Sequence, residues 1–119
     1  MVEYLEARLS RTFTALADPT RRAILARLRA GSLRVTEIAA PFEISLNAVS
    51  KHLKLLERAR LLRREVRGRD HYCSLDATPL GEAAEWTAGY REFWERRLDA
   101  LEALVVARRR ARSRARRRR

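Results

Sequence analysis

The hydrophobic and polar positions between residues 35 and 60 predict a short helix, a tight turn and a longer helix. Apolar residues of the longer helix recur at helical spacing, and all are expected to point inward: Leu46, Val49, Leu53 and Leu56. Ser45 is a favourable N-cap for this helix, which should extend to about Arg58. Pro41 should end the short helix, because proline lacks an N–H donor and its ring clashes with the preceding turn.

The pattern before this motif predicts two more helices. The first extends from Glu3 to Ala17 and carries one apolar stripe, formed by Leu5, Leu9, Phe13 and Leu16. Asp18 and Pro19 separate it from the second, because Asp is a strong N-cap and Pro is favoured at the first helical position. The second helix, residues 19 to about 29, is expected to bury Ile24, Leu25 and Leu28 and to expose Arg21, Arg22 and Arg29.

Two strand-like runs and a long helix follow the motif. Residues 62–66 and 71–75 flank the polar link 67–70, and Gly68 within that link is a hairpin signal. A helix of roughly 40 Å is expected from Pro79 to about Ala107. One apolar stripe runs along it, formed by Trp86, Tyr90, Trp94, Leu98, Leu101 and Val105.

These elements together predict a mainly α fold with a small β-hairpin. Three helices, a hairpin and a flanking helix make a winged helix-turn-helix with additional N- and C-terminal helices. We expect residues 1–107 to form this single domain.

The charge distribution indicates a polyanionic partner. The net charge is +12, and residues 108–119 hold nine arginines and no acid, so 12 − 9 leaves +3 for residues 1–107. A block of like charges is typically disordered in isolation, and we expect this Arg-rich tail to be so. One cysteine, Cys73, excludes an internal disulfide. With neither a membrane-span run nor a signal pattern, the expected compartment is the cytoplasm.

The outer face of the longer helix in the motif has the chemistry of a DNA-reading surface. Its residues are slim and polar near the start and cationic further on, which suits a backbone that must approach base edges and phosphates. The expected contacts are Ser45, Asn47, Ala48, Ser50, Lys51 and Lys54. His52 is a further candidate, although it borders the buried face, where a structural histidine is commoner than a base contact. Arg67 and Arg69 at the hairpin tip are expected to touch phosphates or the minor groove, and a solvated turn is the alternative.

The apolar stripes of the terminal helices exceed what a small domain can cover alone. A two-fold dimer interface is therefore expected at Leu5, Leu9, Trp86, Tyr90, Trp94, Leu98, Leu101 and Val105. The alternative is a small-molecule pocket among the three aromatic residues of the stripe, although aromatic residues at helical spacing more often pack than bind.

Two segments in order resemble the arsenic-repressor (ArsR) family of bacterial transcription regulators. They are LADPTRRAILARL (16–28) and TEIAAPFEISLNAVSKHLKLLERARLLRR (36–64). The resemblance implies a repressor that dimerises through its outer helices and releases DNA in response to a metal, an oxidant or a small molecule. The family's metal positions on the short helix match Arg34 and Thr36, and residues 79–107 contain no histidine, so no metal and no cofactor are expected. A small-molecule effector of unknown chemistry remains open.

Two turns depart from the family pattern. Glu43 and Arg60 lie where the resemblance implies glycine or another residue that tolerates positive φ, and each could cost ~1 kcal/mol.

The sequence favours a homodimeric repressor that binds an inverted-repeat operator in double-stranded DNA. The alternative is a non-specific polyanion-binding or architectural DNA protein dominated by the Arg-rich tail. An enzyme is not expected, because the chain has no Gly-rich phosphate loop, no nucleophile with a nearby base and no acidic cluster.

Overall fold

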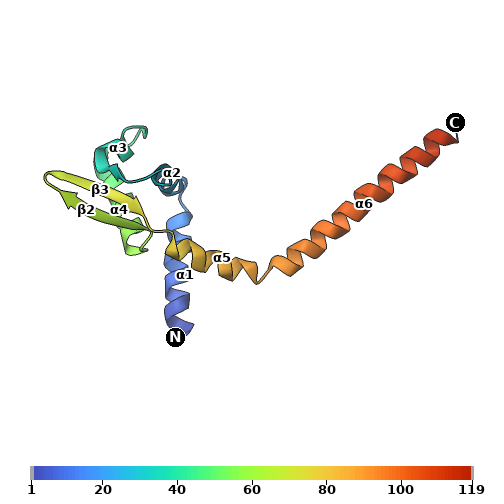
Figure 1. Ribbon diagram of the computed structural model, residues 1–119, viewed down its shortest axis with the longest axis horizontal. Helices are drawn as coiled ribbons and strands as arrows, with labels where there is room; N and C mark the ends of the chain where they lie inside the picture. The colour runs from blue at the N-terminus through green and yellow to red at the C-terminus, as the bar shows by residue number, and fades with distance from the viewer. Residues whose placement is uncertain (1, 119) are drawn as a thin grey trace. The chain divides into compact units, whose positions relative to one another are not determined.

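The computed structural model describes residues 2–118 and contains six helices and three strands (Figure 1). The helices are α1 (Val2–Leu16), α2 (Pro19–Leu28), α3 (Val35–Ala39), α4 (Leu46–Arg58), α5 (Thr78–Ala88) and α6 (Arg91–Arg117). The strands are β1 (Leu33–Arg34), β2 (Leu62–Arg67) and β3 (Asp70–Leu75). The chain divides into two compact units, Met1–Ala84 and Glu85–Arg119, which are described separately. No described helix has the length and apolar character needed to cross a membrane.

The two side-chain caps that the sequence predicted are present at the starts of α2 and α4. The Asp18 carboxylate accepts a hydrogen bond from the Arg21 backbone N–H at 3.0 Å, and Pro19 occupies the first helical position. This backbone N–H lowers the pKa of Asp18, because it stabilises the charged carboxylate. Ser45 Oγ accepts from the Ala48 N–H at 3.0 Å in the same way at the start of α4.

The hairpin is confirmed and belongs to a three-stranded antiparallel sheet. The strand order is β1-β3-β2, and the hairpin register runs from Leu62 opposite Leu75 to Arg67 opposite Asp70. Gly68, at φ 63°, takes the first central position of the two-residue turn, where a positive φ favours glycine. The sequence did not predict β1, because a strand of two residues is too short to show periodicity.

The core of the first unit gathers around α4, which packs against α1, α2, α3 and β2. Val49, Leu53 and Leu56 are fully buried in it, as predicted, together with Ile24 and Ile38. Leu46 is different: 53% of its surface is exposed, so the prediction that it points inward is wrong. It precedes Val49 by nearly one turn and lies beyond the edge of the core.

The buried face of α1 also differs from the predicted stripe. Leu9, Thr12 and Ala15 are buried, whereas Leu5 and Phe13 are exposed. The Thr12 hydroxyl can be buried because it donates to the Arg8 carbonyl at 3.0 Å. A count of apolar positions does not predict the burial of a polar residue whose hydroxyl bonds to its own helix.

The predicted long helix is interrupted, and the predicted disordered tail is helical up to Arg117. Gly89 and Tyr90 separate α5 from α6, and their N–H groups bond to Trp86 and Thr87 carbonyls three residues back. The break falls at Gly89, and glycine is unfavourable in a helix interior, although Gly81 is accommodated within α5. The expected boundary between residues 107 and 108 lies inside α6. Residues 108–117 contain neither Gly nor Pro, and Arg and Ala are good helix formers.

Arg60 holds a left-handed conformation at the end of α4, as the family resemblance implied. Its φ is 61°, and it is the only non-glycine residue with positive φ among residues 2–118. The N–H of Arg60 bonds to the Glu57 carbonyl and that of Leu61 to the Leu56 carbonyl, both at 3.0 Å, which is the Schellman pattern of a helix end. The corresponding expectation for Glu43 is wrong, because that residue does not have a positive φ.

We predict that Arg60→Gly raises the free energy of unfolding by about 1 kcal/mol, because glycine removes the clash between Cβ and the following carbonyl. Urea denaturation followed by circular dichroism measures this change. Arg60→Ala keeps the Cβ atom and should give no such gain. An equal gain in both variants would assign the effect to the lost charge instead.

Candidate nucleic-acid interface

Four of the residues that the sequence selected for DNA reading are exposed on α4 or at its N-cap. Ser45, Asn47, Lys51 and Lys54 are exposed, whereas Ala48 and Ser50 are half-buried. The row of Val49, Leu53 and Leu56 anchors the opposite side of the helix. Since Ser45 already caps the Ala48 N–H, its hydroxyl is committed to the helix end. In the first two turns, Asn47 and Lys51 are therefore the exposed side chains that are best available to contact a partner.

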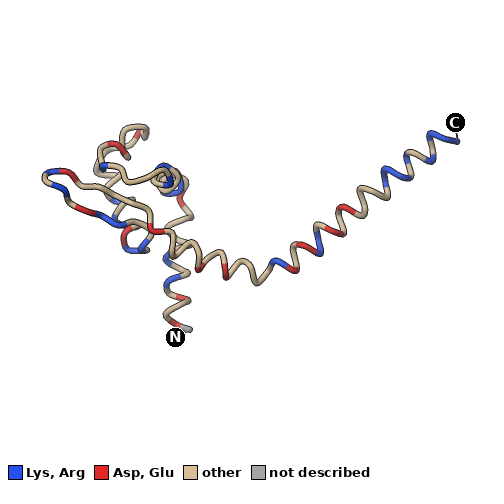
Figure 2. Tube along the Cα trace, viewed as in Figure 1, with Lys and Arg blue, Asp and Glu red and all other residues tan. Residues whose placement is uncertain are grey.

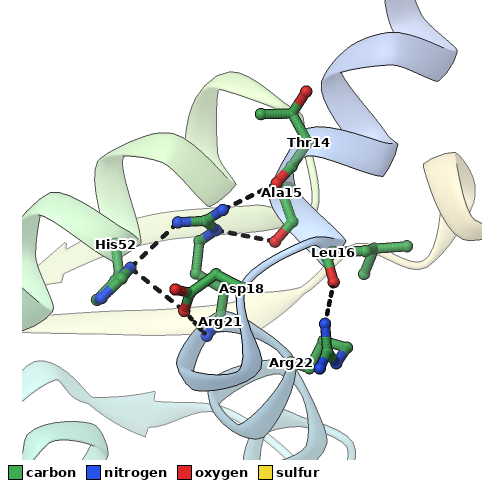
Figure 3. Close-up of polar contacts among 7 residues, drawn as sticks. All are labelled: Thr14, Ala15, Leu16, Asp18, Arg21, Arg22 and His52. Carbon is green, nitrogen blue, oxygen red and sulfur yellow. Dashed lines mark hydrogen bonds and ion pairs between the residues drawn. The ribbon is translucent and has the colours of Figure 1, made fainter.

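His52 does not belong to the open face. Its Nδ1 atom lies 3.4 Å from Nη1 of Arg21 and 3.9 Å from the Asp18 carboxylate, and its side chain is largely covered (Figure 3). An arginine can only donate, so Nδ1 acts as acceptor when His52 is neutral, and the ring proton is then on Nε2. This arrangement supports the structural interpretation of His52 over a base contact.

Arg21 connects three helices, a role that the sequence pattern did not reveal when it placed this residue in solvent. Its guanidinium donates to the Thr14 and Ala15 carbonyls, each at 2.8 Å, and reaches His52 on α4 (Figure 3). Arg22 donates similarly to the Leu16 carbonyl. These carbonyls lie in the last turn of α1, where carbonyl oxygens lack the N–H donors that a continuing helix would supply. The arginines of α2 therefore satisfy carbonyls at the C-terminal end of α1, and Arg21 also connects this end to α4.

The hairpin tip carries the two arginines that were expected in the wing. Figure 2 shows cationic positions along the β2–β3 hairpin and at its tip. Arg67 donates to Glu65 at 3.1 Å and stacks 4.8 Å above the centre of the Tyr72 ring. The hydrogen bond to Glu65 raises the pKa of Arg67 and also orients its guanidinium. Arg69 is exposed beside the turn glycine.

The residues expected in a dimer interface fall into two groups. Leu9 is only 4% exposed within the single chain, so it has little surface left for a partner. Leu5 is exposed on α1. In the second unit the six expected residues are all exposed, with Trp86 in α5, Tyr90 at the break, and the others in α6: Trp94, Leu98, Leu101 and Val105. The ring centres of Trp86 and Tyr90 are 5.3 Å apart in a tilted pair, but both rings are half-exposed, as expected of a surface stripe rather than of a closed pocket.

The metal positions implied by the family resemblance do not fit a metal ion. The Arg34 guanidinium forms an ion pair with Glu37 at 2.9 Å, and Thr36 has no thiolate. Across residues 2–118 there is no group of three or more His, Cys, Asp or Glu side chains arranged as ligands. Cys73 is completely buried in β3, and this burial raises the pKa of its thiol, which disfavours the reactive thiolate.

Comparisons with known proteins agree with this architecture. A family model described as a helix-turn-helix domain matches residues 16–65. The transcriptional repressor SdpR of Bacillus subtilis is 34% identical over 82 residues, which cover 69% of this chain and 91% of the relative. The regulator Rv2034 of Mycobacterium tuberculosis, described as HTH-type, is 41% identical over 95 residues, which cover 80% of this chain and 86% of the relative.

A solved structure extends the likeness to three dimensions. The crystal structure of the ArsR family transcriptional regulator RHA00566 has a TM-score of 0.71 and 39% identity, and the match covers 76% of this chain and 93% of the other. These relatives are transcriptional regulators rather than enzymes. The chain belongs to the ArsR family of winged helix-turn-helix, DNA-binding transcriptional regulators.

Proposed function

We propose that this regulator is a homodimeric repressor that recognises an inverted-repeat operator through α4. The observation that carries this proposal is the first turn of α4, where slim polar side chains are presented on a helix whose opposite side is locked in the core. A helix of this kind fits the major groove with its N-terminal residues against base edges.

The residues of this surface divide between base and phosphate contacts. Asn47 is exposed in the first turn, and an amide can pair with adenine through two hydrogen bonds. Lys54 is two turns further along the same face and carries a point charge suited to a phosphate. Arg67 and Arg69 would contact the backbone or minor groove beside the hairpin.

A second copy of the chain supplies the second recognition helix. The exposed apolar residues of the second unit have the composition of a dimer core, with aromatic residues around the break between α5 and α6 and branched residues along α6. A similarly folded domain of Mycobacterium bovis, 24% identical with a TM-score of 0.59, is described as a homodimeric winged helix-turn-helix DNA-binding domain. Two-fold symmetry would place the recognition helices about one DNA turn apart, ~34–36 Å.

The alternative function, non-specific polyanion binding, is favoured by one observation. The C-terminal part of α6 and its cap carry eight arginines between residues 108 and 118, with no acidic residue among them (Figure 2). Such a segment attracts any duplex through its phosphates.

Selection of bound sequences from a random duplex pool separates the two functions. A repressor should enrich one palindromic sequence and prefer it to bulk DNA by about 10³-fold or more at physiological salt. A protein dominated by its arginines should enrich none. The selection should be repeated with a chain that ends at residue 107, so that the contribution of α4 is seen alone.

We predict that Asn47→Ala reduces affinity for the selected sequence by about 1–3 kcal/mol and relaxes preference at one position of each half-site. Lys54→Ala should instead weaken all sequences alike and reduce the salt slope by about 1. Fluorescence anisotropy against a panel of single-base variants distinguishes the two patterns. If both variants lost affinity uniformly, the assignment of Asn47 to a base would be wrong.

Replacement of Leu101 by Glu should shift the chain toward monomer, because a charge would be buried in the dimer core. Sedimentation velocity at micromolar concentration measures the shift, and operator affinity should fall with it. Ala103→Glu is the matched control, since residue 103 lies about 160° around α6 from Leu101 and should leave the dimer intact. A wild-type chain that sediments as a monomer would contradict the dimer itself.

Removal of residues 108–119 should flatten the salt dependence of binding while leaving the ranking of sequences unchanged. Each lost phosphate contact reduces the log–log slope by about 0.9. Affinities measured over a series of salt concentrations, for the selected sequence and for a scrambled one, give both quantities. A changed ranking would mean that the arginine segment takes part in sequence reading.

A further inference from the structure

An apolar side chain is exposed at the start of α4, among the residues of the proposed reading surface. Leu46 is the first residue of the helix, directly after the cap Ser45, and 53% of its surface is exposed. Ile44, on the other side of the cap, is 40% exposed. Leu46 lies between Ser45 and Asn47, both of which the sequence assigned to DNA, whereas Ile44 lies between Glu43 and Ser45. The exposed apolar surface of Leu46 therefore adjoins the proposed reading face.

Helix geometry places Leu46 beside the polar row. At about 100° per residue, Leu46 lies about 60° from Val49, Ser50 about 100° and Asn47 about 160°, all in the same rotational direction. Leu46 therefore adjoins Ser50 on the flank that leads to the exposed Asn47. Leu53 lies about 20° from Leu46 in this projection, two turns further along α4, and is fully buried, so Leu46 is exposed because it precedes the core along the helix axis.

The major groove offers one apolar group, the C5-methyl of a pyrimidine. Thymine carries it beside its O4 acceptor, and protein contacts to it are made by apolar side chains. We propose that Leu46 is a specificity-determining residue that packs on the methyl group of a thymine in each half-site of the operator, with Ile44 covering the same edge. The operator half-site then contains a thymine at the base step next to the one read by Asn47.

This inference rests on the proposed function, because it requires that the first turn of α4 enters the major groove. It adds a base identity that hydrogen-bonding residues alone do not supply. Ser50, beside Leu46, can bond to several bases, so the methyl contact would decide between thymine and cytosine at that step.

Thymine-to-deoxyuridine replacement tests the contact, because it removes only the methyl group. The selected operator is made from unmethylated synthetic DNA, since 5-methylcytosine presents the same group, and each thymine of the half-site is replaced in turn. We expect one position per half-site to lose about fourfold in affinity, and the doubly substituted operator to lose about fifteenfold, which corresponds to one buried methyl group per subunit.

Variants of the protein test whether Leu46 causes this loss of affinity. Leu46→Ala should bind the thymine and deoxyuridine operators equally, whereas Leu46→Met, which keeps an apolar side chain of similar volume, should retain the difference. Val66→Ala removes another exposed apolar side chain, from β2, and should retain the fourfold loss as the matched control. Thermal unfolding checks that each variant is folded, and Leu46→Ala should unfold near the wild-type temperature because the residue is half-exposed.

Distinct outcomes overturn the inference and the proposed function. If the wild type selects an operator but no deoxyuridine replacement weakens binding, or the loss persists in Leu46→Ala, the methyl contact is wrong and sequence recognition by α4 stands. A selected half-site without thymine would contradict the methyl contact in the same way. If the wild type selects no sequence, both the methyl contact and the repressor function are lost.

Discussion

The burial of one row of α4 is the constraint on which the rest of the first unit depends. Val49, Leu53 and Leu56 have no exposed surface, and they meet α2, α3 and β2 in a single core. Because an α-helix turns about 100° per residue, this row determines that Asn47, Lys51 and Lys54 face the opposite side. A rotation of α4 by one residue would expose the leucines and bury a charge, which is costly on both counts. The reading face is thus specified by apolar residues that never touch DNA.

The arginines at the start of α2 provide a second, polar constraint. Arg21 and Arg22 donate hydrogen bonds to carbonyls in the last turn of α1, and Arg21 also contacts His52 on α4. A helix end that lacked these donors would leave carbonyl groups unpaired, which disfavours its burial against other elements. Arg21 thus joins α1 to the middle of α4 by polar contacts, in addition to the direct packing of these two helices.

Periodicity and capping rules predicted the features that depend on residues close together in the sequence. They failed for burial and hydrogen bonds that depend on residues far apart in the sequence. Asp18 and Ser45 start helices through hydrogen bonds within three positions, so both caps could be read from the chain. The burial of Leu9, Thr12 and Ala15 in place of the full leucine stripe depends on how α1 sits on α4, which spacing does not encode. Arg21 illustrates the same limit, since its partners lie 6, 7 and 31 positions away. For α4 itself, Asn47, Lys51 and Lys54 are exposed as predicted, whereas Ala48 and Ser50 are half-buried. Leu46 was misplaced because the pattern does not show where the core ends.

The composition of the last third of α6 makes the helix sensitive to its ionic surroundings. Arginines recur four positions apart at 108, 112 and 116 and at 110, 114 and 118, so like charges adjoin one another on the helix surface. Each such pair opposes the helix by a few tenths of a kcal/mol at low salt, and bound anions relieve the repulsion. The number of helical turns in this segment should therefore grow with counterion concentration. Far-UV ellipticity would then report the binding of a polyanion to this segment.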